Sequence, residues 1–291
     1  MNITATQVPH PSIALPQVEL DVRCDRHFQS FVSHQYAAYP FRLSRSFRLE
    51  AEHPGRLYLY LMNASPGLFA HDALEIRVCL QEQTQLYLTD QAAMKVHSMP
   101  LEGTFAQMAH HIHVGAGSHL EYVPEPIILY PDAEFHQRSH VTLDPTAHLF
   151  WSEIILPGRL ARQEWYDFRL YRNRLQVYDL SDRLLFTDAM VLTGQENPFK
   201  HQPLFAALPA IANIIAILPD TDLAQLTTWL SSTDFAPQQS LQAGHSPLPN
   251  CNGVLIRAIA DRASTLRAYI RMVLNYIRQL THQSPLPEVP K

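Results

Sequence analysis

The stretch 74–80, Leu-Glu-Ile-Arg-Val-Cys-Leu, decides the fold class because its apolar and polar residues alternate strictly. Successive side chains of a strand point to opposite faces, so the four aliphatic residues would share one buried face. Similar runs, separated by proline or polar turns, occur at 56–62, 85–89, 107–114, 127–130, 140–143, 148–155, 164–171 and 184–191. We therefore predict a mainly β body over 18–192, built as a sandwich, a barrel or a coil of strands.

The pattern changes after Gly194. The apolar segment 204–218 is interpreted as a buried or interface helix, and Asp220 or Thr221 can cap a helix that continues through Leu223, Leu226 and Leu230. A strand is expected at 253–260. The helical part, 194–282, has no long linker before it, so we expect it to pack on the β body within a single domain, 1–291.

The chain is predicted to close with an amphipathic helix, because apolar residues recur at helical spacing from 266 to 280. Arg267, Arg271 and Arg278 lie off that stripe and are interpreted as a solvated face. The tail 285–291 is rich in proline and predicted to be disordered.

Composition excludes several classes of function. Of 291 residues, 46% are hydrophobic and 17% charged, with a net charge of -5 and no run of Lys or Arg that could track a phosphate backbone. The segment 1–16 lacks the pattern of a secretory signal, and 204–218 is shorter than the roughly 20 residues that cross a bilayer. Cys24, Cys79 and Cys251 lie too far apart for a preformed zinc site. We expect a cytoplasmic protein without nucleic-acid or membrane contact.

Sixteen histidines raise the question of a metal site, and the tightest group is His110, His111 and His113. On a strand, His111 and His113 would share one face while His110 points to the other. His111 and His113 are therefore weak candidate ligands. His71 and Asp72 form a second weak pair, with the alternative that Asp72 bonds the backbone of its own turn.

No nucleophile elbow, phosphate loop or His-Glu-x-x-His pair is present, and Gly115 to Gly117 reads as a turn. From the residues alone, two functions stay open. One is a metal-dependent hydrolase that uses His111 and His113, and the other is a β-rich ligand-binding module. The hydrolase would hold one metal ion tightly, and apart from that alternative we expect no tightly bound cofactor.

Four segments together carry a more specific message. They are LMNASPGLFAHD at 61–72, DQAAMKV at 90–96, LEYVPEPIILY at 120–130, and Gly158-Arg159 followed by Glu164. In this order and spacing they resemble the urease accessory protein family UreD, called UreH in some species. The resemblance extends over most of the chain and is strongest up to Leu192.

The resemblance implies a non-catalytic scaffold, or chaperone, for urease maturation by nickel insertion. Such a metallochaperone scaffold would bind the urease apoprotein, UreF and, through UreF, the GTPase UreG. The family fold implies a β-helix-like body of stacked, coiled sheets with helices toward the C-terminal end. It also implies an internal polar passage with transient nickel(II) contacts, which suits dispersed imidazole and carboxylate groups.

The chain departs from the family pattern at three turns. Ser65-Pro66-Gly67 stands where Gly-Gly is usual, Ala70-His71-Asp72 stands for Gly-Gly-Asp, and Gln163 replaces a glycine. Glycine in such turns serves positive φ or close backbone approach, so these turns must differ locally. We expect Asp72 and Glu121 to face either the passage or a structural donor, with Lys95 able to pair with either. The positions that match the family pattern are Asn63, Ser65, Gly67, Asp72, Gln91, Lys95, Glu121, Tyr122, Pro124, Gly158, Arg159 and Glu164.

Overall fold

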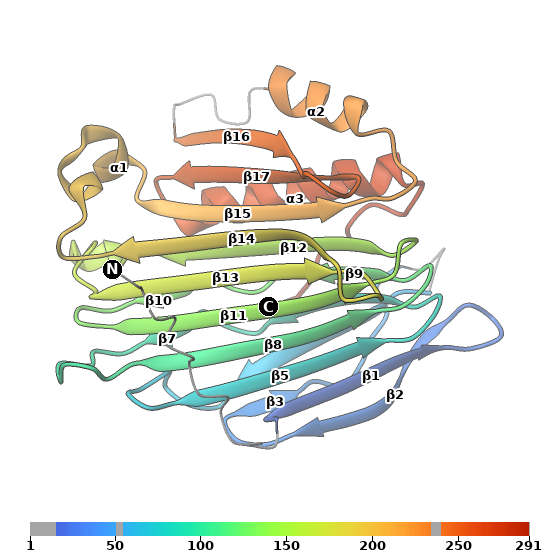
Figure 1. Ribbon diagram of the computed structural model, residues 1–291, viewed down its shortest axis with the longest axis horizontal. Helices are drawn as coiled ribbons and strands as arrows, with labels where there is room; N and C mark the ends of the chain where they lie inside the picture. The colour runs from blue at the N-terminus through green and yellow to red at the C-terminus, as the bar shows by residue number, and fades with distance from the viewer. Residues whose placement is uncertain (1–15, 51–54, 234–239, 291) are drawn as a thin grey trace, which may run out of the picture.

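The computed structural model describes residues 16–50, 55–233 and 240–290, and its strands form two mixed β-sheets (Figure 1). Sheet A has the order β14 (Leu184–Thr193), β13 (Leu170–Tyr178), β11 (Glu134–Leu143), β8 (Ala106–Val114), β5 (Ala73–Leu80), β1 (Val18–Cys24) and β2 (Ser30–Ala37). Sheet B has the order β16 (Leu241–Pro247), β17 (Gly253–Ala260), β15 (Ala210–Ile217), β12 (His148–Leu156), β9 (His119–Tyr122), β6 (Gln85–Asp90), β4 (Leu57–Asn63) and β3 (Phe41–Leu43). The prediction of a mainly β protein is confirmed.

The chain alternates between the two sheets, and the strands it returns to are parallel neighbours. In sheet A, β5, β8, β11 and β13 run parallel, while β4, β6, β9 and β12 do so in sheet B. The short strands β7 (Met94–Val96) and β10 (Ile127–Leu129) pair with each other, and β10 also pairs with β12. Antiparallel strands lie at both ends of each sheet.

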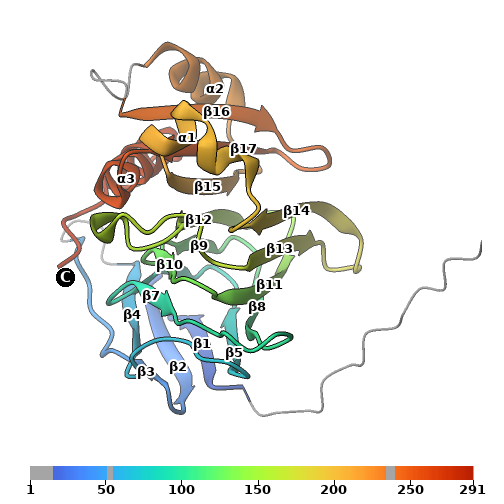
Figure 2. The same ribbon diagram turned by 90° about the vertical axis from the view of Figure 1, so that its left-hand side faces the viewer.

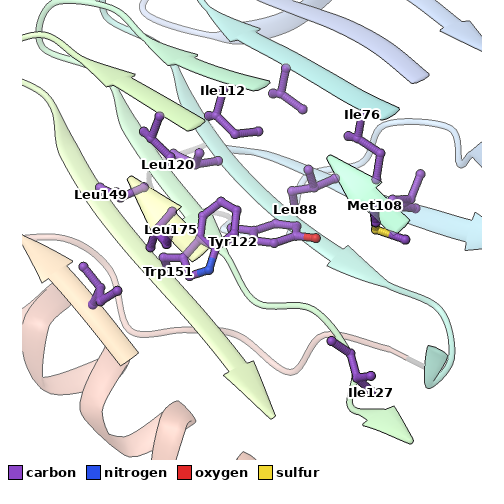
Figure 3. Close-up of a cluster of buried hydrophobic side chains, with 14 of the residues drawn as sticks. Ile76, Leu88, Met108, Ile112, Leu120, Tyr122, Ile127, Leu149, Trp151 and Leu175 are labelled. Carbon is purple, nitrogen blue, oxygen red and sulfur yellow. The ribbon is translucent and has the colours of Figure 1, made fainter. Parts of the chain in front are cut away.

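The main hydrophobic core lies between the sheets, because the inward positions of each strand are apolar. The alternation at 74–80 places Leu74, Ile76, Val78 and Leu80 there. Figure 3 shows Tyr122 and Trp151 side by side in this core, and their ring centroids are 4.4 Å apart.

A second core covers the outer face of sheet B. The helix α3 (Ala263–Leu280) packs there against β12, β15 and β17, and Figure 2 shows it on the side of sheet B away from sheet A. The shorter helix α2 (Leu223–Ser232) packs beside it. Among the described residues, no helix covers the outer face of sheet A.

The C-terminal part contains both confirmed and wrong predictions. The strand at 253–260 and the closing helix are confirmed as β17 and α3. The helix predicted within 204–218 is wrong, because only Pro203–Ala207 is helical (α1) and Ala210–Ile217 is the strand β15, buried on both faces. The cap of α2 is Asp222 rather than Asp220 or Thr221.

The segment after α3, where disorder was predicted for 285–291, contacts the fold in its described part. Leu286 is 6% exposed, and its backbone N–H donates to the Asn275 side chain at 2.7 Å. The guanidinium of Arg271 donates to the carbonyls of Leu286 and Pro287. The remaining helical pieces are the 3-10 turns η1 (Leu160–Arg162) and η2 (Pro198–His201). No described helix has the length and apolar character needed to span a membrane.

Candidate functional site

A buried carboxylate between the sheets is the centre of the candidate site. Glu153, on β12 of sheet B, is 5% exposed and points toward sheet A. The side-chain amide of Gln137 donates to Glu153 Oε1 at 2.5 Å, and the amide of Asn173 donates to Oε2. Gln137 and Asn173 are register partners on β11 and β13. Two neighbouring strands of one sheet therefore hold a single carboxylate of the other.

The surroundings of Glu153 disfavour its charge. Burial raises its pKa from the ordinary 4.5 to about 7, Asp188 adds to the shift, and the hydrogen bonds from Asn173 and Gln137 oppose it. A carboxyl group with a pKa near neutrality can gain or lose a proton, or accept a cation, at little electrostatic cost.

Several buried polar atoms around Glu153 have no hydrogen-bond partner among the described residues. Both polar atoms of Asn213 are in this state, although Asn213 lies opposite Glu153 on β15 and is 2% exposed. The Tyr171 hydroxyl and Asn173 Oδ1 are also without a partner. Such atoms are rare in protein interiors and indicate a place for water or another polar guest.

A small cavity adjoins this carboxylate on its other side. Its volume is about 30 Å³, which is room for one or two water molecules or ions. His110 is 3% exposed, with Nδ1 3.2 Å from the Ser139 hydroxyl and Nε2 3.4 Å from that of Tyr122. Burial lowers the pKa of His110 to about 4, so its imidazole is neutral at physiological pH. The polar lining comprises Asp90, His110, Tyr122, Glu125, Gln137 and Glu153, and Pro124 also lines the cavity.

Two arginine–carboxylate pairs lie at the ends of this polar interior. Glu125, which lines the cavity, pairs with Arg267 of α3 at 2.5 Å between Oε2 and Nη2. Asp188 of β14 pairs with Arg257 of β17 at 2.5 Å. In each pair the carboxylate side chain is 10% exposed or less, and the arginine is about half exposed.

Glu121 does not point into the interior. It lies on the outer face of sheet B, where Arg278 of α3 donates to both of its oxygens, at 2.8 Å and 2.5 Å. Arg56 lies 3.1 Å from Glu121 and 3.2 Å from Glu50, which also approaches Arg278 at 3.1 Å. The expected pairing of Glu121 with Lys95 is replaced by these contacts. Arg278 has no exposed surface, so its interpretation as part of a solvated face was wrong.

The first family segment, 61–72, forms a turn that is held by hydrogen bonds between its own residues. Asn63 Oδ1 accepts from the Ser65 backbone N–H at 2.8 Å. The single proton of the Ser65 hydroxyl can be donated either to Asn63 Oδ1, at 2.7 Å, or to the Gly67 carbonyl, at 2.9 Å. A Cβ on Gly67 would meet the carbonyl oxygen of Lys95. Asp72 Oδ2 accepts from the Phe69 N–H at 2.7 Å, which is the local turn role weighed for it above. These residues shape the backbone.

The Gly158-Arg159 segment forms a second local unit. Arg159 makes two hydrogen bonds to the Glu164 carboxylate, at 2.5 Å and 2.7 Å, and its guanidinium lies 4.5 Å from the centre of the Tyr130 ring. Gly158 has φ of +153°, and a Cβ there would meet the Glu164 carbonyl. Gln91 and Lys95 are exposed on the surface.

Two of the three departures from the family pattern fall on left-handed residues. His71 has φ of +71° and Gln163 has φ of +59°. Glycine adopts this conformation without the steric cost that a Cβ brings, so the family's usual glycines fit these positions. In this chain both positions keep the left-handed conformation although His71 and Gln163 carry side chains.

The exposed histidines do not form a metal centre in the part of the chain described. As predicted from strand alternation, His110 points into the core while His111 and His113 lie on the outer face of sheet A. His111 is 3.9 Å from Glu75, and His71 lies in the surface turn. Among the described residues, no three His, Cys, Asp or Glu side chains are placed to hold a metal ion.

Sequence reasoning missed the central residues Glu153, Gln137 and Asn173. One signal was available for Glu153, because it is the only charged residue in the run 148–155 and a strand buried on both faces rarely carries one. Nothing in the sequence shows that Gln137 and Asn173 would meet it, since their strands become neighbours only through the topology.

Comparison with known proteins agrees with the four segments. A family model described as the UreD urease accessory protein matches residues 16–291. A urease accessory protein UreD of Trichodesmium erythraeum is 46% identical over 274 residues, covering 94% of this chain and 98% of the relative. The UreD of Haloarcula marismortui is 31% identical over 255 residues (87% and 83%), and a UreD 2 of Brucella canis is 27% identical over 230 residues (78% and 75%). The chain therefore belongs to the UreD family of urease accessory proteins, which serve urease maturation and are not themselves enzymes.

Proposed function

We propose that this chain is a cytoplasmic scaffold that binds the urease apoprotein and UreF, recruits the GTPase UreG through UreF, and gives nickel(II) a path through its polar interior. The family supports a role in urease maturation. The observation that carries the path is Glu153, a buried carboxylate with unpartnered polar atoms beside it.

The donor set of the interior suits a cation in transit. It offers carboxylate oxygens from Glu153 and Asp90, amide oxygens from Asn173 and Asn213, and the neutral imidazole of His110. Nickel(II) accepts these oxygen and nitrogen ligands. Because the donors are spread along the interior, each would hold the ion weakly, and weak contacts are what transfer requires. Nickel is the cargo here and not a resident cofactor.

The topology supports the β-helix-like coil implied by the family. The chain alternates between the sheets. Each time it returns to sheet B, along β4, β6, β9 and β12, or to sheet A, along β5, β8, β11 and β13, the new strand lies parallel to the previous one in that sheet. We propose that the polar interior follows this coil, since each turn contributes side chains to the space between the sheets.

The path is tested with Glu153→Gln, which keeps the shape and removes the charge. Co-expressed with urease and the other accessory proteins, this variant should form the same complex but activate urease more slowly. Glu82→Gln is the matched control, because Glu82 is exposed in the turn before β6. Activation at the wild-type rate by Glu153→Gln would exclude the path through this carboxylate.

The scaffold role is tested separately by omitting the chain from the co-expression. Urease should then remain largely inactive at physiological nickel concentrations. A pull-down with untagged components should recover the urease apoprotein, UreF and UreG, with UreG lost when UreF is left out. Full urease activity without this chain contradicts the scaffold proposal, whichever path nickel takes.

A further inference from the structure

Two arginines, Arg267 and Arg257, cover the carboxylates at the ends of the polar interior. Arg267 reaches from α3 to Glu125, and Arg257 reaches from β17 to Asp188, with 2.5 Å between nitrogen and oxygen in each pair. The side chains of Arg267 and Arg257 are 47% and 52% exposed, whereas those of Glu125 and Asp188 are 6% and 10% exposed. Each guanidinium thus stands at the surface over a carboxylate that faces inward.

Both carboxylates connect to the interior. Glu125 lines the cavity together with Asp90 and Glu153, and its backbone N–H donates to Asp90 Oδ2 at 3.2 Å. At the other end, Arg257 is the register partner of Asn213, which is the register partner of Glu153. The negative charge of Asp188 reaches Glu153 and raises the pKa of its carboxyl group. The polar interior therefore has an acidic group at each end, and each is covered by an arginine.

An arginine in this position competes with a metal ion for the same oxygen atoms. The guanidinium is always charged and occupies carboxylate lone pairs through hydrogen bonds, so a paired carboxylate cannot ligate a divalent ion at the same sites. A half-exposed arginine loses little when it turns into solvent, because water replaces its hydrogen bonds and screens its charge. The exchange of one cation for another keeps the buried carboxylate compensated throughout.

We propose that Arg267 and Arg257 are placeholder cations, and that a divalent metal ion enters or leaves the interior by displacing one of them from Glu125 or Asp188. This inference rests on the proposed path through Glu153. It adds that, without metal, the arginines neutralise the carboxylates Glu125 and Asp188. A divalent ion, with its higher charge, then competes with an arginine for these oxygen atoms.

The test measures binding of Ni²⁺ alone to the purified full chain. Arg267→Met and Arg257→Met should each bind Ni²⁺ more tightly than the wild type, on the order of tenfold, since one repelling charge beside a partly solvated site is removed. Added guanidinium ion should reverse the gain. Arg262→Met is the matched control, because Arg262 pairs with Asp261 at 2.6 Å on the surface outside the polar interior. Unchanged Ni²⁺ affinity in both folded variants overturns the proposal.

A second measurement uses the unaltered chain, in case these variants do not fold. Saturating Ni²⁺ should speed hydrogen exchange at the Nη–H groups of Arg267 and Arg257, which bond Glu125 and Asp188, several-fold and leave that of Arg262 unchanged. Equal exchange with and without Ni²⁺ also overturns the proposal. If Glu153→Gln impairs urease activation while the arginine variants bind Ni²⁺ like the wild type, the role of the arginines is rejected and the path through Glu153 is retained. If Glu153→Gln has no effect, the path itself fails.

Discussion

Arg278 and Glu121 form a buried ion pair although they lie 157 residues apart in the sequence. The arginine comes from the last helix and the glutamate from β9, so the pair joins α3 to the middle of sheet B. Glu50 and Arg56 complete the charge balance on either side. Glu121 is therefore an anchor for the helical layer, and the resemblance alone left this role open.

Breaking this pair from one side should be costly. Either Arg278→Met or Glu121→Gln leaves a buried charge without its main partner, so each should lower the free energy of unfolding by about 3–5 kcal/mol. The double variant should lose clearly less than the sum of the two single losses. Urea denaturation of all four proteins measures this coupling, and additive losses would show that the pair acts as two independent groups.

Gly158→Ala should destabilise the protein by more than about 1 kcal/mol, because φ of +153° and the nearby Glu164 carbonyl exclude a Cβ. Gly244→Ala is the matched control, since Gly244 lies on β16 with open space around it. The control should stay within about 0.5 kcal/mol of the wild type. Thermal unfolding of the two variants compares them directly, and equal melting temperatures would contradict this account of the Gly158 turn.

The stability of the protein should fall from pH 4.5 to pH 7 through Glu153. Its folded pKa of about 7 lies above the ordinary 4.5, so the folded state binds the proton more tightly and this contribution is lost as pH rises through the folded pKa. Glu153→Gln is neutral at every pH. It should match the wild type below pH 4.5 and exceed its stability above pH 7 by up to about 3 kcal/mol. If the difference in the free energy of unfolding between the wild type and Glu153→Gln stays constant across this pH range, the pKa shift of Glu153 is ruled out.

Leu286→Ala should show whether the segment after α3 is part of the packed fold. Leu286 is 6% exposed within the second core, so its truncation should cost about 2–5 kcal/mol. Glu288→Ala is the control, because Glu288 is exposed and lies two residues further on. Chemical denaturation distinguishes the two, and a neutral Leu286→Ala would mean that the segment adds nothing to stability.

Strand alternation predicted the β body because strands such as β5, β8 and β11 have one mainly apolar and one more polar face. The same logic failed at β15, where Ala and Ile occupy both faces and the period of two disappears. Arg278 was misjudged for a related reason. It follows Ile270 and Leu274 at intervals of four, which places it on the buried stripe, yet its charge suggested solvent. Only the opposing Glu121 explains its position.

The candidate site was less accessible to sequence reasoning than the fold. The family segments located Tyr122 and Pro124, which do line the cavity, but most of the other matching positions shape turns. Glu153, Gln137 and Asn173 belong to three separate strands, and their meeting depends on which strands become neighbours. Such contacts between distant segments leave no local periodicity to detect.

The helix α3 supplies the cations for both Glu125 and Glu121, and this has a consequence for the order in which the chain is made. A ribosome synthesises Glu50, Glu121 and Glu125 well before it reaches Arg267 and Arg278. Until then Glu50 and Glu121 can pair with Arg56 but not with Arg278, and Glu125 lacks Arg267. The sheets can therefore begin to pair during translation, but the outer layer can lock only after the last helix has emerged.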